Sequence, residues 1–159
     1  MRLTQWTDYT LRVLMYCAAC QTRAKPVTIS EIAERHGISR SHLTKIVREL
    51  SARALLQTTR GRGGGIRLAL PAQEINLGAV VRATETDFAL VECFDPVSNR
   101  CGLSRHCRLK SLLDEALQNY LAVLDSASLA DLVPARGVAA DASRPGSIRL
   151  VAGLPPTRD

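Results

Sequence analysis

The chain has 159 residues, of which 46% are hydrophobic and 23% charged, and its formal net charge is +6. This length fits one domain, or a small domain with an appended segment, and the composition is that of a soluble globular protein rather than a fibrous or disordered one. No apolar run approaches the roughly 18 residues that suggest a transmembrane helix, and the N-terminus lacks the apolar core of a signal peptide, so we expect a cytoplasmic protein without a membrane partner.

The basic charge is concentrated in the first half of the chain. Residues 1–70 contain 12 Lys or Arg against 4 Asp or Glu, whereas residues 71–159 contain 9 against 11. A cationic half of this kind indicates a polyanionic partner, most often nucleic acid.

Residues 7–22 predict a helix that is apolar on nearly every side, and therefore largely buried. Thr7 is a suitable N-cap, and Asp8 lies in the first turn, where a carboxylate interacts favourably with the helix dipole. Cys17 and Cys20 form a CxxC pair on one side of this helix. Such a pair can bind a metal or take part in redox chemistry, but the preferred interpretation is that both are small core residues.

Residues 28–53 predict a helix-turn-helix. A first helix over 29–35 precedes Gly37, which suits the left-handed residue that ends a helix, and a second helix over 40–53 is capped by Ser39. The outer stripe of the second helix has cations and small hydroxyl donors but no carboxylate: Arg40, Ser41, Thr44, Lys45 and Arg48. A recognition helix needs such donors for bases and phosphates, and the missing acids favour DNA contact over a merely solvated face.

A glycine-rich basic hairpin follows, with short strands predicted over 55–60 and 66–70. The glycines between the strands let the backbone approach a partner closely. The cations of this hairpin are Arg60, Arg62 and Arg67. The segment lacks a GxxxxGK[ST] motif and a helix directly after the glycines, which argues against a nucleotide-binding loop. We interpret it as the wing of a winged helix, directed at phosphates and the minor groove.

A short helix over 77–84, capped by Asn76, is expected to brace the wing. A long helix over 108–124 has two adjacent apolar stripes, which favours pairing with a second copy over packing wholly on its own domain. Residues 128–133 predict a last helical turn. Residues 134–159 are rich in proline without any period and predict a disordered tail.

Three cysteines lie in the loop before the long helix, with the spacing C-x7-C-x5-C: Cys93, Cys101 and Cys107. Helix- and strand-breaking residues separate them, so the loop can bend three thiolates toward one point. Neighbouring cations and the start of the long helix favour the thiolate form. In a reduced cytoplasm this density indicates a metal or iron–sulfur site, and the alternatives are three ordinary thiols or a disulfide with one spare thiol.

These parts, in this order, resemble the iron–sulfur winged-helix regulators of the IscR/NsrR family over about residues 1–133. The stretches most similar to the NsrR branch are LTQWTDYTLRVLMY, ISRSHLTKIV, TTRGRGGGIRLALPA, CGLSRHCRLK and LADLV. The resulting expectation is a mainly α fold with a small β-wing: a winged helix-turn-helix over 1–85, a cluster loop over 86–107, and a dimerisation helix with a short terminal helix over 108–133.

The resemblance also implies the ligands of an iron–sulfur cluster. The three loop cysteines would bind it, with [4Fe–4S] favoured over [2Fe–2S], and Asp8 of the partner subunit would be the fourth ligand. The residues alone do not select Asp8 over Glu92, Asp95 or His106. The interval between Cys93 and Cys101 has seven residues, which is longer than is usual in the family.

The implied protein is a homodimeric repressor, not an enzyme, that binds double-stranded operator DNA, senses nitric oxide and releases the DNA when the cluster is nitrosylated. A carboxylate holds the iron of a soft cluster weakly, which suits a sensor. One alternative is a regulator that senses iron–sulfur supply or redox state, and another is a zinc-stabilised DNA-binding module. An electron-transfer or redox enzyme fits least, because most cations lie on the DNA-type elements.

Overall fold

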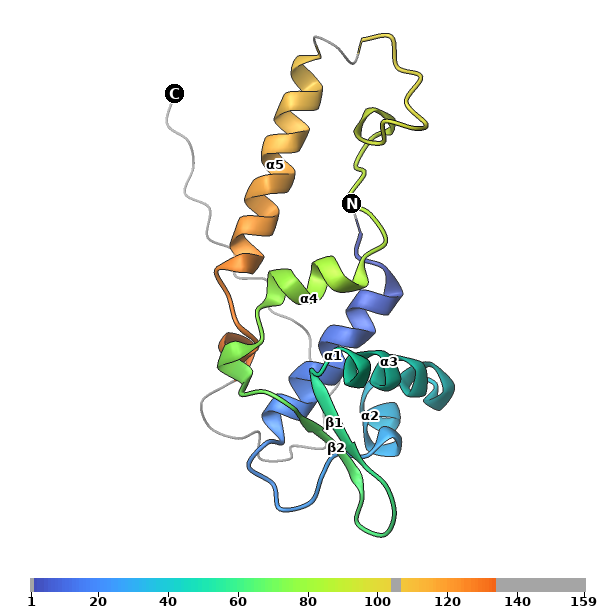
Figure 1. Cartoon of the computed structure of the whole chain (residues 1–159), viewed down its shortest axis with the longest axis vertical. Coiled ribbons are helices and arrows are strands. Elements are labelled where there is room, and N and C mark those ends of the chain that lie inside the picture. Colours follow the sequence, from blue (N-terminus) through green and yellow to red (C-terminus); the bar gives the residue numbers. More distant parts are fainter. Residues whose placement is uncertain (1, 104–106, 134–159) are drawn as a thin grey trace.

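The computed structural model describes residues 2–103 and 107–133, and in these ranges it shows a winged helix from which a long helix rises (Figure 1). The helices and strands of the described ranges are α1 Gln5–Ala19, α2 Ile29–His36, α3 Arg40–Ala52, β1 Leu56–Thr59, β2 Gly65–Leu68, α4 Leu77–Thr84 and α5 Arg108–Asp125. Short 3-10 turns occur at Ala72–Glu74, Glu92–Phe94 and Leu129–Leu132. The predicted fold class, mainly α with a small β-wing, is confirmed. The tail predicted over 134–159 lies outside the described residues.

None of the described helices is long and apolar enough to cross a membrane.

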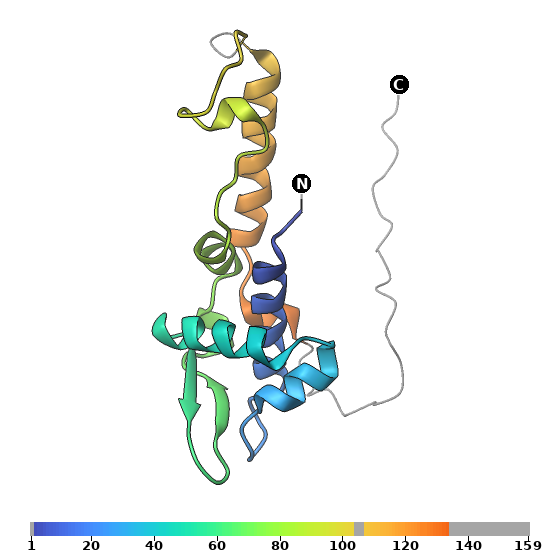
Figure 2. The same cartoon turned by 90° about the vertical axis from the view of Figure 1, so that its right-hand side faces the viewer.

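The core lies where α1 contacts α2, α3, α4 and β2. The inner stripe of α3 is buried as its spacing predicts: Leu43, Ile46, Val47 and Leu50. Strands β1 and β2 pair antiparallel, with Leu56 opposite Leu68, and Val27 adds an isolated bridge to Ile66. The hairpin projects from this core at the end opposite α5, so the wing and α5 mark the two ends of the molecule (Figures 1 and 2).

The prediction that Thr7 caps α1 is wrong, because Thr4 caps it. The Thr4 hydroxyl accepts a hydrogen bond from the Thr7 backbone N–H at 3.3 Å, so the helix begins at Gln5. Thr7 then faces inward, is fully buried, and donates its hydroxyl to Thr84 of α4 at 3.0 Å. Met15 of the same helix is 37% exposed, so α1 is not buried on every side.

The base of α5 is fixed to the winged helix by several bonds to α4. The Asn76 side chain caps α4 by accepting from Ala79 N–H at 2.9 Å, and its amide donates to the Asp125 carbonyl at 2.7 Å. Arg82 forms an ion pair with the Asp125 carboxylate. A Cβ atom at Gly78 would lie 1.9 Å from an Asp125 carboxylate oxygen, so a larger residue there would displace the Asp125 side chain. The described part of α5 therefore keeps a defined orientation relative to the DNA-reading elements.

Ala54 ends α3 in the left-handed conformation, with φ of 56°, and Leu55 N–H donates to the Leu50 carbonyl at 2.9 Å. A residue with a Cβ is strained in that conformation, whereas glycine is not. Ala54→Gly is therefore expected to raise the free energy of unfolding by about 0.5–1 kcal/mol. Urea unfolding measures the change. Ala52→Gly, at the last residue of α3, is the control and should lower the free energy of unfolding by up to ~1 kcal/mol. If both substitutions lowered it, Ala54 would not be strained.

Candidate DNA-reading face and cysteine loop

The outer face of α3 is presented to solvent. Its five predicted contact residues are all exposed: Arg40, Ser41, Thr44, Lys45 and Arg48. In the part of the chain that the structure describes, none of the three cations among them forms an ion pair. The Thr44 hydroxyl donates to the Arg40 carbonyl at 2.8 Å, and the Ser41 hydroxyl lies 3.3 Å from that of Ser39. The cations are thus the most available donors for a polyanion.

Replacing Arg40 or Lys45 with alanine is expected to weaken operator binding by ~1–3 kcal/mol for each contact made to a base. The fold should persist, because both side chains point away from the core. Gel-shift titration at fixed salt measures the affinity. Arg53→Ala is a matched control, since Arg53 follows the same helix but is paired with Glu49 at 3.0 Å. Unchanged affinity in both test variants would remove this face from the interface.

The wing cations fall into two classes. Arg60 and Arg62 are exposed near the turn, where Gly61 and Gly63 adopt φ of 93° and 82°. Arg67 is half-buried, and its guanidinium donates to the carbonyls of Arg23 at 3.1 Å and Ala24 at 2.5 Å. Those bonds tie β2 to the loop after α1. Arg67 therefore positions the wing, whereas the turn cations remain available to phosphates.

Two of the wing glycines lie so close to other backbone atoms of the protein that a side chain would not fit. A Cβ at Gly64 would lie 2.2 Å from the Thr59 carbonyl oxygen, and a Cβ at Gly65 would lie 2.5 Å from that of Val27. The close approach expected of these glycines is therefore made to the protein's own backbone.

Replacing Arg60 or Arg62 with alanine is expected to weaken specific and non-specific DNA binding alike, and to lower the slope of log affinity against log salt by about one per lost phosphate contact. Arg67→Ala should instead lower the stability of the fold, because two carbonyls lose their donor. Salt-dependent titrations and thermal unfolding separate the two effects. A loss at only one operator base for Arg60→Ala would contradict the phosphate assignment.

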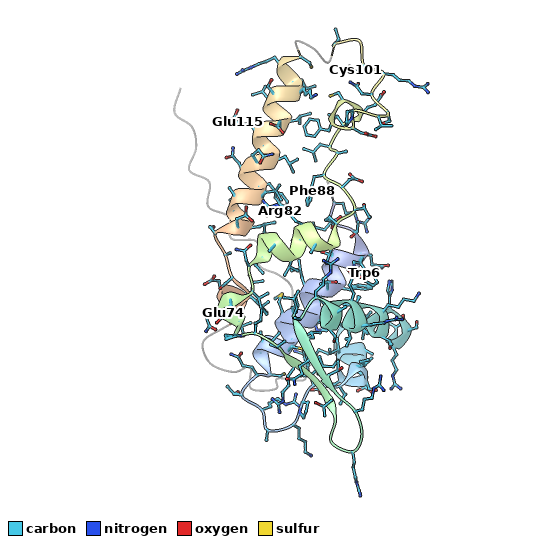
Figure 3. All side chains as sticks on the ribbon, viewed as in Figure 1. Trp6, Glu74, Arg82, Phe88, Cys101 and Glu115 are labelled. Atoms are coloured by element: carbon cyan, nitrogen blue, oxygen red, sulfur yellow. The ribbon has the colours of Figure 1, made fainter. Side chains whose placement is uncertain are left out.

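The three loop cysteines lie at the end of the molecule opposite the wing, where Figure 3 labels Cys101. Cys93 sits in the 3-10 turn Glu92–Phe94, and Cys107 is the N-cap residue of α5 without a side-chain capping bond. All three are free and half-buried. Within the described ranges, no three His, Cys, Asp or Glu side chains are gathered closely enough to hold a metal ion. His106, the other candidate ligand, is outside those ranges.

Asp8 lies on the exposed side of α1. Its carboxylate pairs with Arg12 one turn later, with oxygen–nitrogen distances of 2.9 and 3.0 Å, and both side chains are almost half exposed. An exposed pair of this kind contributes little to stability. A second molecule can therefore reach the Asp8 carboxylate at small cost.

The two cysteines of the CxxC pair differ in environment. Cys17 is 2% exposed, and burial raises the pKa of its thiol to about 12, with a smaller contribution from Cys20. A buried neutral thiol suits the expected core role. Cys20 is half-buried, and its sulfur accepts a hydrogen bond from Arg23 at 3.5 Å.

Three aromatic rings connect α1 to α3, and the sequence pattern did not single them out. The His42 ring lies 6.0 Å from that of Trp6 and 5.5 Å from that of Tyr9, which it meets edge to face. Trp6 and Tyr9 flank Asp8 on α1, whereas His42 belongs to the first turn of α3. Only the fold brings these residues together, so no local signal in the sequence could have found them.

One side of α5 is apolar and exposed. Leu117 and Leu121 are buried against the chain's own elements. Leu109, Leu112 and Val123 are 61%, 46% and 68% exposed. Of the two apolar stripes predicted for this helix, one is thus packed within the described chain, while the other presents side chains to solvent.

A family model described as Rrf2, iron-dependent transcriptional regulator, matches residues 3–135. The HTH-type transcriptional regulator NsrR of Bacillus subtilis (strain 168) is 50% identical over 133 residues, which are 84% of this chain and 90% of that regulator. The NsrR regulator of Halalkalibacterium halodurans is 48% identical with the same coverage. The crystal structure of oxidized Staphylococcus aureus CymR matches with a TM-score of 0.66 at 25% identity, covering 84% of this chain and 97% of that one. The T. potens IscR structure matches with a TM-score of 0.63 at 24% identity, covering 83% and 85%.

Proposed function

The chain belongs to the Rrf2 family of iron-dependent transcriptional regulators, and we propose that it is a cluster-dependent repressor that senses nitric oxide. It is a DNA-binding regulator and not an enzyme. We assign residues 1–85 to DNA binding, 86–107 to the cluster loop and 108–133 to dimerisation. The protein acts in the cytoplasm, where DNA and reduced thiols occur together.

The observation that carries this proposal is the set of three free, half-buried cysteines in the loop that ends at the N-cap of α5. Sulfur ligands suit iron–sulfur clusters. The residues therefore fit such a group. Three thiolates leave a fourth ligand position to be filled, and Asp8 of the partner subunit is our candidate for it. We favour a [4Fe–4S] cluster, with [2Fe–2S] as the alternative.

The second chain is expected to cover the exposed apolar side of α5. Leu109, Leu112 and Val123 would be removed from water in a helix pair, which is the dominant favourable term in such association. A symmetric dimer also suits operator recognition, since two α3 helices then meet half-sites about one helical turn apart. In such a dimer, each cluster site has a partner subunit that can supply the Asp8 carboxylate.

The release of DNA follows from how these parts are connected. When bound, the cluster supplies iron that reacts with nitric oxide. Without the cluster, the loop cysteines would be released, and the Asp8 carboxylate would pair with Arg12 as it does in this structure. Because Trp6 and Tyr9 beside Asp8 pack on His42, a shift of α1 reaches the recognition helix directly. The two α3 helices would lose the spacing that the operator requires.

Anaerobic purification of the full chain tests this proposal. A brown protein with iron and acid-labile sulfide supports the cluster, and operator binding that needs this form supports the repressor. A colourless protein containing zinc would favour the zinc-stabilised DNA-binding module instead. Operator binding that responds to iron or peroxide but not to nitric oxide would favour a regulator of iron–sulfur supply or redox state.

A further inference from the structure

The long interval between the first two loop cysteines is closed by a carboxylate. An oxygen of Glu92 accepts a hydrogen bond from the Arg100 backbone N–H at 2.6 Å. Glu92 directly precedes Cys93, and Arg100 directly precedes Cys101. One bond therefore joins the two ends of the interval, although eight positions separate the bonded residues.

The residues inside the interval fold into a compact turn. The Asp95 carboxylate accepts from the Val97 backbone N–H at 2.9 Å and from the Ser98 hydroxyl at 2.6 Å. Asn99 donates its N–H to the Asp95 carbonyl at 3.1 Å, and its side chain accepts from Cys101 N–H at 2.9 Å. The extra length is thus taken up by the turn.

We propose that Glu92 is a positioning residue of the cluster site, which holds the backbones of Cys93 and Cys101 together before iron binds. This inference rests on the proposed function, because it assumes that these two thiolates bind the same group. A closed loop has already lost much of the chain entropy that ligation would otherwise remove. Hydrogen bonds that hold ligating residues in place raise the affinity of a metal site, because less chain entropy is lost when the metal binds.

The alternative role for Glu92 is that of an iron ligand. The two roles require different interactions of the carboxylate, with iron in one case and with a backbone N–H in the other. A ligating carboxylate would have to direct one of its two oxygens to iron. A positioning carboxylate stays on the backbone, where its oxygen acts only as an acceptor. A glutamine retains an acceptor oxygen but is a poor iron ligand, so Glu92→Gln separates the two roles, whereas Glu92→Ala removes both.

The test uses metal-free full-length protein and brief oxidation by diamide, which converts two nearby thiols to a disulfide while the diamide is reduced to its hydrazine. Trypsin leaves each loop cysteine in its own peptide, because cleavage follows Arg82, Arg100, Arg105 and Arg108. Mass spectrometry therefore counts each of the possible pairings. Asp87→Ala is the matched control, because it removes the same charge and a similar bond, to Ala89 N–H at 2.9 Å, but lies outside the interval.

We expect the rate of Cys93–Cys101 disulfide formation to fall ~3- to 10-fold in Glu92→Ala, the range for loss of one hydrogen bond, and to stay near wild type in Asp87→Ala. Glu92→Gln should recover most of the rate. Equal rates in the Glu92→Ala and Asp87→Ala proteins would overturn the proposal. A Glu92→Gln protein as slow as Glu92→Ala would overturn it as well.

A second measurement follows the cluster in the anaerobic holo-protein. Glu92→Ala should still form the cluster but lose its absorbance to a chelator ~3- to 10-fold faster than wild type, with Glu92→Gln close to wild type. Complete loss of the cluster in both variants, with unchanged disulfide rates, would make Glu92 a ligand and overturn the positioning role. A wild-type protein without any cluster would instead sink the proposed function, while the disulfide rates would still report on loop closure.

Discussion

Replacing any one of Cys93, Cys101 or Cys107 with alanine is expected to abolish the visible absorption of the cluster, and with it tight operator binding. The reason is that three thiolates and one partner carboxylate leave no spare donor. Operator affinity should fall at least ~100-fold, toward the level of non-specific binding, because the cationic faces remain but their spacing is no longer held. Absorbance, iron content and gel-shift titration of the same anaerobic samples measure both effects.

The two cysteines of α1 are the controls for this experiment. Cys17→Ala and Cys20→Ala should retain the cluster and nearly normal operator affinity. Cys17 is buried in the core, so its removal costs stability rather than a ligand, and Cys20 gives up only a weak bond to Arg23. If replacing Cys17 removed the cluster while Cys93 proved dispensable, the ligand assignment would be reversed.

The elements of the fold were predictable because each leaves a local signal. Helix α4 spans Leu77–Thr84 with Asn76 as its N-cap, as predicted, since the capping side chain and the apolar period lie within a few residues. Gly37 takes the left-handed conformation expected of it. The exposed face of α3 could be predicted from the helical spacing of its apolar residues, because an amphipathic helix that buries one stripe must expose the other.

The contacts that shape the site were less predictable, because they join residues distant in sequence. Thr7 was taken for a cap, and only the packing of α1 on α4 turns it inward to Thr84. The sequence also gives no sign that the Arg67 guanidinium donates to the carbonyls of Arg23 and Ala24, or that Arg100 N–H donates to Glu92. Tertiary contacts of this kind bring polar side chains together, and no local pattern reveals them.

Titration of the wild-type holo-protein with nitric oxide, under anaerobic conditions, is expected to release the operator while the dimer persists. If the exposed apolar side of α5 drives pairing, as we propose, the dimer should not depend on the cluster. A difference of ~3 kcal/mol between two dimer geometries already lowers affinity about 150-fold. Operator affinity and cluster absorbance, followed in one sample, give the measurement. Bleaching of the cluster with undiminished operator binding would sink the sensing mechanism, even with every ligand correctly named.

Asp8→Ala tests the proposed fourth ligand independently of the cysteine ligands and of dimerisation. The variant should still dimerise and keep its three cysteine ligands, because Asp8 is exposed and contacts only Arg12 through its carboxylate among the described side chains. Its cluster should be more labile, or open to an added thiol, since one iron has lost its protein donor. Asp131→Ala, which removes a carboxylate distant in sequence from the cysteine loop, controls for charge. Cluster stability in Asp8→Ala equal to that of wild type, with no shift of its spectrum on adding thiol, would transfer the fourth position to another residue.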